Sequence, residues 1–290
     1  MIQQNDMCLI VFAWRSHPDY PLILAANRDE FYLRRTRPAA WWGHAVSVLA
    51  GHDEEAGGTW LGITRRGRFA ALTNVRAPTE RNPHAPSRGT LVLSALQSSE
   101  TIPLWHASNA PRMSAYNGFN LLTGDIGPLE SSGASNLAPY PRLDYFSNRN
   151  GDLPRALAPG VYGLSNANLD TPWPKVTRAV GGFACLIASR VAVEPLVRLL
   201  ENRELARDVV LPSTGVPYEW ERALSAIQIR AKGYGTRTST VMMVRNDGLT
   251  TFFERTYGTS DPEHFSDRHY EFTIDRAAHP SPRARASGPQ

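Results

Sequence analysis

The sequence has only two cysteines, Cys8 and Cys185, so it can form at most one disulfide bond. This excludes a disulfide framework. Cys185 lies in an apolar stretch typical of a packed helix, and a reducing compartment is the simpler interpretation of both thiols. The eight histidines show no spacing typical of a metal site, and no Cys-x-x-Cys-His motif is present for haem attachment. We therefore expect neither a metal nor a bound cofactor.

Long apolar runs and long basic runs are also missing. The run at 9–13 is too short for the core of a signal peptide, and no stretch approaches the roughly 18 apolar residues of a membrane span. The 31 basic and 27 acidic residues give a net charge of only +4, without a basic run or an aromatic–basic pattern typical of a nucleic-acid groove. We therefore expect a soluble, cytoplasmic protein with no integral membrane segment and no nucleic-acid partner.

No linker rich in proline, glycine or serine interrupts residues 8–256, and no internal repeat is present. A single domain over residues 7–265 is therefore expected. Residues 1–6 are polar and form an extension ahead of Met7, which the pattern favours as the true start. Residues 266–290 are polar and basic and cannot form a core, so a disordered tail is expected there.

The most informative feature present is Met7-Cys8, followed by the apolar residues 9–13. Removal of Met7 would leave Cys8 with both a thiol nucleophile and an α-amine that can act as its general base. The ordinary pKa values of these groups, about 8.5 and about 8, allow the amine to take the thiol proton after modest tuning. The alternative is that Cys8 is a small apolar residue at the start of a buried strand.

A second apolar run, at 22–26, ends abruptly in the tetrapeptide Asn27–Glu30. This is typical of a buried strand that carries polar groups to its end, and a hairpin with the first strand would return them to the level of Cys8. A carboxylate there could orient an N-terminal amine, and a guanidinium could favour the thiolate. Adjacent side chains point to opposite faces of a strand, so Arg28 and Asp29 serve one site only if the strand turns there. The alternative is an ion pair at a strand end.

The pattern of apolar residues predicts a mixed chain in which strands dominate the first third. The predicted strands are 8–14, 21–27, 46–50, 60–64, 68–74, 118–123, 160–165, 238–245 and 249–255. The predicted helices are one that follows residues 87–89, and 174–187, 192–203 and 217–229. Antiparallel hairpins with helices clustered late favour an α+β fold packed in layers.

A series of motifs in order resembles the NRDE family, also called the Transport and Golgi Organisation protein family. The motifs are Met-Cys at 7–8, the stretch around Asn-Arg-Asp-Glu at 24–31, and the segments 57–63, 70–74, 87–89, 116–122, 162–166 and 234–241. The resemblance covers about residues 7 to 256. It implies links to membrane-trafficking organisation, haem mobilisation and lipid homeostasis, but no established reaction.

The family is in turn similar to the N-terminal nucleophile (Ntn) hydrolases, most closely to the penicillin V acylase and bile-salt hydrolase branch. This similarity implies a four-layer αββα sandwich of mainly antiparallel sheets, with the N-terminal residue in a groove between the sheets. It also implies catalytic roles for Cys8 as nucleophile, Asp29 as the carboxylate that orients its amine, Asn74 and Asn166 as oxyanion donors, and Arg237 as a late arginine. In that branch an arginine comes directly before the Asn-x-Asp residues. Here Ala26 stands at that position, and the arginine, Arg28, lies between Asn27 and Asp29.

Two functions follow from these observations. The first is a hydrolase that cuts a non-peptide C–N amide bond of a small molecule through Cys8, with Asn27 and Arg28 in its binding site. The second is a non-catalytic carrier of haem, a lipid or an acyl compound, in which the same groove holds an amphipathic ligand. The aromatic pair Trp41-Trp42 could line such a groove, although packing in the core is the alternative for both rings.

Overall fold

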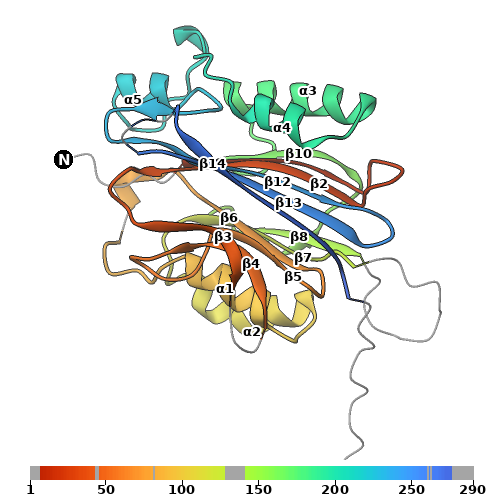
Figure 1. The fold of residues 1–290 in the computed structure, drawn as a ribbon. Helices are drawn as coiled ribbons and strands as arrows, with labels where there is room; N and C mark the ends of the chain where they lie inside the picture. The colour runs from red at the N-terminus through yellow and green to blue at the C-terminus, as the bar shows by residue number, and fades with distance from the viewer. Residues whose placement is uncertain are drawn as a thin grey trace, which may run out of the picture.

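A computed structural model describes residues 7–42, 46–80, 82–127, 141–259, 261 and 263–275. They form two seven-stranded sheets stacked face to face, with helices on both outer surfaces (Figure 1). Every pairing between neighbouring strands is antiparallel. This helix–sheet–sheet–helix order confirms the expected α+β fold, a four-layer αββα sandwich.

The first sheet contains the strands nearest both ends of the described chain. Its order is β10 (Gly160–Leu164), β1 (Met7–Trp14), β2 (Leu22–Phe31), β12 (Tyr234–Val244), β13 (Leu249–Tyr257) and β14 (Phe265–Thr273), with β11 (Arg230–Ala231) paired to β12. The second sheet is a meander in sequence order. Its strands are β3 (Thr36–Trp42), β4 (Val48–Asp53), β5 (Leu61–Thr64), β6 (Arg68–Asn74), β7 (Phe119–Asp125), β8 (Arg142–Ser147) and β9 (Arg155–Ala156).

The helices cover the two outer faces. On the first sheet lie α3 (Pro174–Ser189), α4 (Val193–Leu200) and α5 (Tyr218–Ala223), and on the second lie α1 (Gly89–Gln97) and α2 (Ile102–Met113) (Figure 1). Two 3₁₀ turns, Pro78–Glu80 and Asp208–Val210, occur in the connections.

The alternation of side chains along β1 shows how the layers are held together. Ile10 and Phe12 belong to the apolar core between the two sheets, whereas Leu9 and Val11 belong to the core beneath α3 and α4. Both faces of β1 are therefore buried, which explains why the run at 9–13 is continuously apolar.

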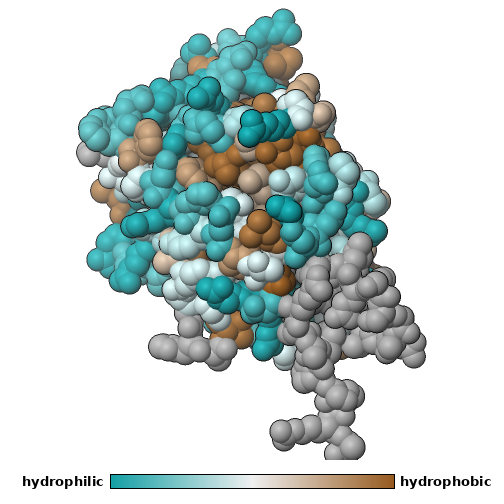
Figure 2. Space-filling view, turned by 45° about the vertical axis from the view of Figure 1, so that its right-hand side comes forward, coloured by the Kyte–Doolittle hydropathy of each residue, from teal (hydrophilic) through white to brown (hydrophobic). Residues whose placement is uncertain are grey.

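The surface contrasts with this interior. Figure 2 shows one face on which hydrophilic residues predominate and apolar residues form smaller areas among them. Among the described helices, none is both long enough and apolar enough to cross a membrane.

Most predicted elements are present, and the main differences concern weakly patterned segments. The expectation of a disordered tail from Ser266 is wrong for residues 266–273, because β14 pairs with β13 from Phe265 to Thr273. Its residues up to His269 are exposed, and only Tyr270 and Phe272 near its end pack on the core, so most of this edge strand shows no apolar alternation. The helix expected over 217–229 ends at Ala223. Residues 1–6 and 276–290 lie outside the described residues.

Candidate active site

The β1–β2 hairpin places Cys8 at one end of the first sheet. Cys8 pairs with Arg28, and both lie at the end of the hairpin far from its turn. Cys8 has the same parity along β1 as Ile10 and Phe12, so its side chain faces the space between the sheets. The side chain is only 5% exposed, and that exposure opens into a pocket.

The pocket has a volume of about 390 Å³, enough for a small ligand. Its lining comes from both sheets and from the segment 82–89 that leads into α1. Eight charged residues contribute to its walls: Arg28, Asp29, Glu30, Arg34, Arg37, Asp53, Arg88 and Glu254. Gly58 (φ +80°) lets the rim approach closely, because a Cβ there would overlap the carbonyl oxygen of Gly89.

A row of three side chains crosses the first sheet along the pocket. Cys8 pairs with Arg28, which pairs in turn with Thr238 on β12. Neighbouring strands lie about 4.8 Å apart, so the row spans about 10 Å. Arg28 Nη1 and Thr238 Oγ1 are both buried and have no hydrogen-bond partner among the described residues. Buried polar atoms of this kind normally have partners, so the row offers two positions for polar ligand atoms.

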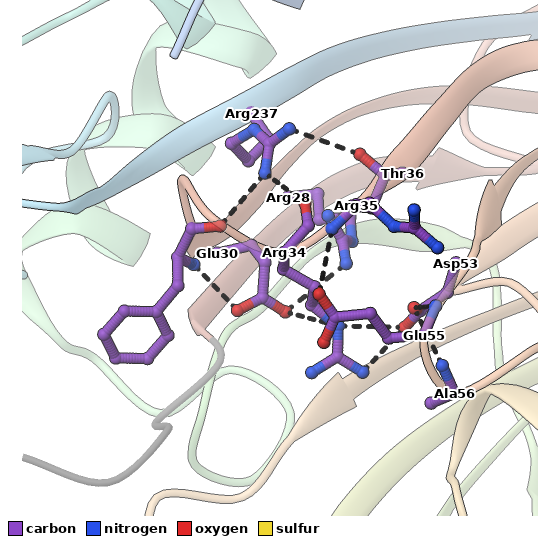
Figure 3. Close-up of polar contacts among 10 residues, drawn as sticks. Arg28, Glu30, Arg34, Arg35, Thr36, Asp53, Glu55, Ala56 and Arg237 are labelled. Carbon is purple, nitrogen blue, oxygen red and sulfur yellow. Dashed lines mark hydrogen bonds and ion pairs between the residues drawn. The ribbon is translucent and has the colours of Figure 1, made fainter. Parts of the chain in front are cut away.

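The carboxylate of Glu30 organises the guanidinium groups beside this row (Figure 3). Arg28 Nη2 lies 3.3 Å and Arg34 Nε 3.4 Å from Glu30 Oε2, and Arg34 Nη2 reaches Asp53 Oδ2 at 2.8 Å. Arg237 lies next to this cluster rather than among the pocket-lining residues. Its Nη1 donates to the carbonyl oxygens of Phe31 and Arg34 at 3.0 and 2.9 Å, so it fixes the chain that follows β2.

Asn27 and Asp29 point away from Arg28 and Glu30, toward the helices. Asn27 Nδ2 donates to the carbonyl oxygens of Leu200 and Ile227, both at 2.9 Å, so this side chain ties the sheet to the connections around α4. Asp29 pairs with Met7 in the register and also reaches the pocket. The tetrapeptide therefore divides its side chains between two faces, although Asp29 is also among the residues that line the pocket.

Asp29 is a fully buried carboxyl group. Thr236 Oγ1 donates to its Oδ1 at 2.6 Å, while its Oδ2 has no hydrogen-bond partner among the described residues. Burial raises the pKa of Asp29 to about 6, against the opposing positive charges of Lys175 and Arg28 and the hydrogen bond from Thr236.

Lys175, in the first turn of α3, is a residue that the sequence interpretation missed. It is buried, and burial lowers its pKa to about 8, while negative charge on Asp29 and Cys8 raises it and Arg76 lowers it further. The sequence held a signal for this burial. Lys175, Ala179 and Phe183 are spaced four residues apart, so they share the buried face of α3.

The two asparagines expected to bind an oxyanion lie together but have different surroundings. Asn74, at the end of β6, lines the pocket. Asn166 is buried, and its Nδ2 donates to the carbonyl oxygen of Asn74 at 2.8 Å. The neighbouring Ser165 Oγ donates to the carbonyl oxygen of Cys8, also at 2.8 Å. Segment 165–166 thus holds Cys8 and Asn74 in a fixed relation.

The aromatic pair lies outside the pocket, and each ring packs in a core. Trp41 packs edge-on against Phe272, with centroids 5.0 Å apart, in the core between the sheets. Trp42 Nε1 donates to the carbonyl oxygen of Ala50 at 2.9 Å, and its ring packs in the core beneath α1 and α2. Cys185, expected to be packed, lies in α3 but is exposed.

Glu254 of β13 is a second residue that the sequence interpretation missed. It occupies a core-facing position two residues after Phe252, and its Oε1 accepts a hydrogen bond from the Ala39 N–H at 2.6 Å. Burial raises its pKa to about 7. The sequence held a signal for Glu254, because the alternation along this strand requires an apolar residue at its position.

We predict that Glu254→Gln removes a loss of stability that wild type shows as pH rises from about 4.5 to about 7. The folded-state pKa lies above the ordinary value of 4.5, so the contribution of Glu254 is fully present below about pH 4.5 and is lost as pH rises through about 7. The loss is on the order of 3 kcal/mol. Urea unfolding between pH 5 and pH 8.5 should show a smaller decline for the variant than for wild type. Equal declines would show that the carboxyl group ionises in the folded state without a penalty.

The chain was compared with known proteins. The profile of the family described as Transport and Golgi organisation 2 matches residues 7–259. The human Transport and Golgi organization protein 2 homolog is 36% identical over 284 residues, covering 92% of this chain and 99% of that protein. The Drosophila melanogaster Transport and Golgi organization protein 2 is 30% identical over 281 residues, covering 88% and 94%. A variant of conjugated bile acid hydrolase from Clostridium perfringens matches with a TM-score of 0.41 at 9% identity, covering 93% of this chain and 94% of that chain.

Proposed function

The chain belongs to the Transport and Golgi organisation 2 family, and we propose that this member uses Cys8 to hydrolyse a C–N amide bond in a small polar molecule. One observation carries the proposal. The Cys8 side chain faces the same pocket as two buried polar atoms without partners, Arg28 Nη1 and Thr238 Oγ1. A nucleophile beside unused hydrogen-bonding groups is the arrangement that an acyl-transfer site requires.

The proposed reaction has two steps. Cys8 Sγ attacks the amide carbonyl carbon, a C–S bond forms, and the C–N bond breaks as the leaving nitrogen takes a proton. Water then hydrolyses the thioester and regenerates the thiol. If Cys8 is the first residue, its α-amine can receive the thiol proton and pass it to the leaving nitrogen.

Two pocket residues support this sequence of events. Asn74 lies on the pocket wall, where its side-chain amide can donate to the oxyanion, and Asn166 holds its backbone. Asp29 pairs with Met7, the residue before Cys8, and lines the pocket, so its carboxyl group is the candidate to orient an amine on Cys8. The role proposed for Asn166 and Arg237 is therefore to position neighbouring groups.

The pocket also defines the substrate class. Its walls carry eight charged side chains, and the unpartnered Nη1 of Arg28 can only donate a hydrogen bond. We expect a substrate with a carbonyl or carboxylate acceptor about 5–10 Å from the bond that is cut, one or two strand spacings from Cys8. An apolar carrier groove lined by Trp41 and Trp42 has no support from this geometry, since both rings pack in the cores.

A panel of N-acyl amides tests the proposal. Amides with and without a carboxylate on the acyl or amine part would be incubated with the protein, and amine release would be followed by mass spectrometry. Hydrolysis should occur, and it should favour substrates that carry the carboxylate. Absence of hydrolysis across the panel, together with tight binding of haem or an acyl compound that Trp41→Ala weakens, would support the carrier function instead.

A further inference from the structure

Glu254 is a buried carboxyl group of the pocket that takes no part in the proposed reaction. It is 2% exposed and lies on β13, on the face of the first sheet that meets the second sheet. The pocket carboxyl groups of Glu30 and Asp53 are held by arginines in ion pairs. Among the described residues, by contrast, none forms an ion pair with Glu254. Its negative charge is therefore not neutralised by direct contact with these parts of the protein.

Within the described parts of the chain, only one oxygen of this carboxyl group is engaged. Oε1 accepts a hydrogen bond from the Ala39 N–H at 2.6 Å, and Thr256 Oγ1 lies 3.5 Å from the same oxygen. Oε2 lies near Gly51 of β4, where an added Cβ would be 3.7 Å away from it. Glu254 and Gly51 both line the pocket, and the absence of a side chain on Gly51 leaves space beside Oε2. Oε2 is thus placed to accept a hydrogen bond from a bound molecule.

Two threonine hydroxyl groups on β12 lead from Arg28 toward this carboxyl group. Thr238 pairs with Arg28 on β2. Thr240 lies two residues further along the same face and pairs with Glu254 on β13. Both Oγ1 atoms are buried and have no hydrogen-bond partner among the described residues, and Thr238 lines the pocket. Buried polar atoms normally have partners, so this band of unpartnered atoms indicates that the polar part of the site extends beyond Arg28 to β13.

The two ends of this band have opposite chemistry. Arg28 Nη1 can only donate a hydrogen bond, whereas an ionised Glu254 can only accept one. Their strands, β2 and β13, are two strand spacings or about 10 Å apart, and both side chains line the same pocket. Burial raises the pKa of Glu254 to about 7, although Arg28 and Arg268 lower it. A cation bound at Oε2 would offset the cost of that burial.

We propose that Glu254 is a specificity-determining residue that binds a positively charged amine of the substrate, while Arg28 binds a carboxylate on the same molecule. The proposal rests on the function proposed above, since it defines the substrate that Cys8 cuts. The substrate class is an amide in which either the acyl or the amine part carries both charged groups. The unpartnered hydroxyl of Thr238 lies between the two charged residues and can donate to the carboxylate or accept from the amine.

Binding to a chain that lacks the nucleophile tests the proposal apart from catalysis. Cys8→Ala would be titrated by calorimetry at pH 7.5 with two pairs of amides, the members of each pair differing in a single amine. The pairs are γ-glutamyl anilide with glutaryl anilide, and Nα-acetyl-lysine with Nα-acetyl-norleucine. In at least one pair, we expect the member with the amine to bind about tenfold more tightly or better, because hydrogen bonds to charged groups are the stronger ones.

Glu254→Gln in the same background separates charge from shape, because the two side chains have nearly the same volume. It should weaken binding of the amine-bearing member by about tenfold and change that of its amine-free partner by less than about twofold. Glu271→Gln, at an exposed position of the neighbouring strand β14, is the matched control and should change neither affinity. A preference for the amine that survives Glu254→Gln would overturn the proposal.

The comparison within each pair needs no variant of Glu254, so it decides the proposal even if Glu254→Gln fails to fold. Equal affinities within both pairs, or no binding of any of the four amides, would overturn it. If the amine-bearing amide binds through Glu254 but wild type cuts none of the four, the dipolar site stands and the proposed hydrolysis fails. If wild type cuts amides without regard to the amine, the hydrolysis stands and the role of Glu254 fails.

Discussion

Replacing Cys8 with alanine is expected to lower amide hydrolysis by at least about a thousandfold, because Cys8 is the only cysteine among the described residues that line the pocket. The free energy of unfolding should change by only about 1 kcal/mol, since the side chain is small and borders a pocket. Steady-state kcat/KM on the best amide and urea unfolding would be measured in parallel. Cys185→Ala, at an exposed position of α3, is the matched control and should leave both quantities unchanged.

This pair of variants separates chemistry from binding. A carrier would bind its ligand equally well after Cys8→Ala, and any trace of amide hydrolysis would persist in the variant. Hydrolysis that survives Cys8→Ala would place the activity elsewhere and would remove Cys8 from the mechanism.

The second large effect concerns stability. Glu30→Gln is expected to reduce the free energy of unfolding by about 3 kcal/mol, because it leaves Arg28 and Arg34 without the buried carboxylate between them. The substitution preserves side-chain volume, so the loss reports charge rather than a cavity. Urea unfolding, followed by tryptophan fluorescence, would measure it.

An exposed ion pair in the same region provides the control for Glu30. Arg37 approaches Glu54 at 2.5 Å, but the Arg37 side chain is 73% exposed. Glu54→Gln should therefore cost less than about 1 kcal/mol. Equal losses for Glu30→Gln and Glu54→Gln would show that the Glu30 cluster is no more important than a surface pair.

The layers of the fold could be predicted from the sequence where local patterns were strong. The continuous apolar run after Cys8 identified β1, and the strands predicted at 238–245 and 249–255 correspond to β12 and β13. The strand β14 was missed because only its last part, with Tyr270 and Phe272, packs on the core, while backbone hydrogen bonds to β13 hold the rest. The helix α2 was missed because Pro103 and Pro111 obscure it, although Pro103 is acceptable in the first turn.

The site was predictable only in part, since its residues come from distant segments. Motif order placed Cys8, Arg28, Asp29 and Asn74 in one neighbourhood, and all four line the pocket. The place of Lys175 on the helix side of the first sheet could not be predicted, because only the packing of α3 against β1 and β10 brings residue 175 there. Glu254 was likewise hidden within a strand whose apolar alternation it interrupts.

The most direct test of the central claim is the intact mass of the protein during turnover. The chain would be mixed with a reactive thioester or anilide of the preferred acyl group, quenched in acid within seconds, and analysed whole and by peptide mapping. We predict a mass increase equal to one acyl group, located on Cys8 and absent from Cys8→Ala. An unmodified Cys8 throughout amide turnover, or an acyl group on Cys185 alone, would contradict the assignment of Cys8 as the nucleophile.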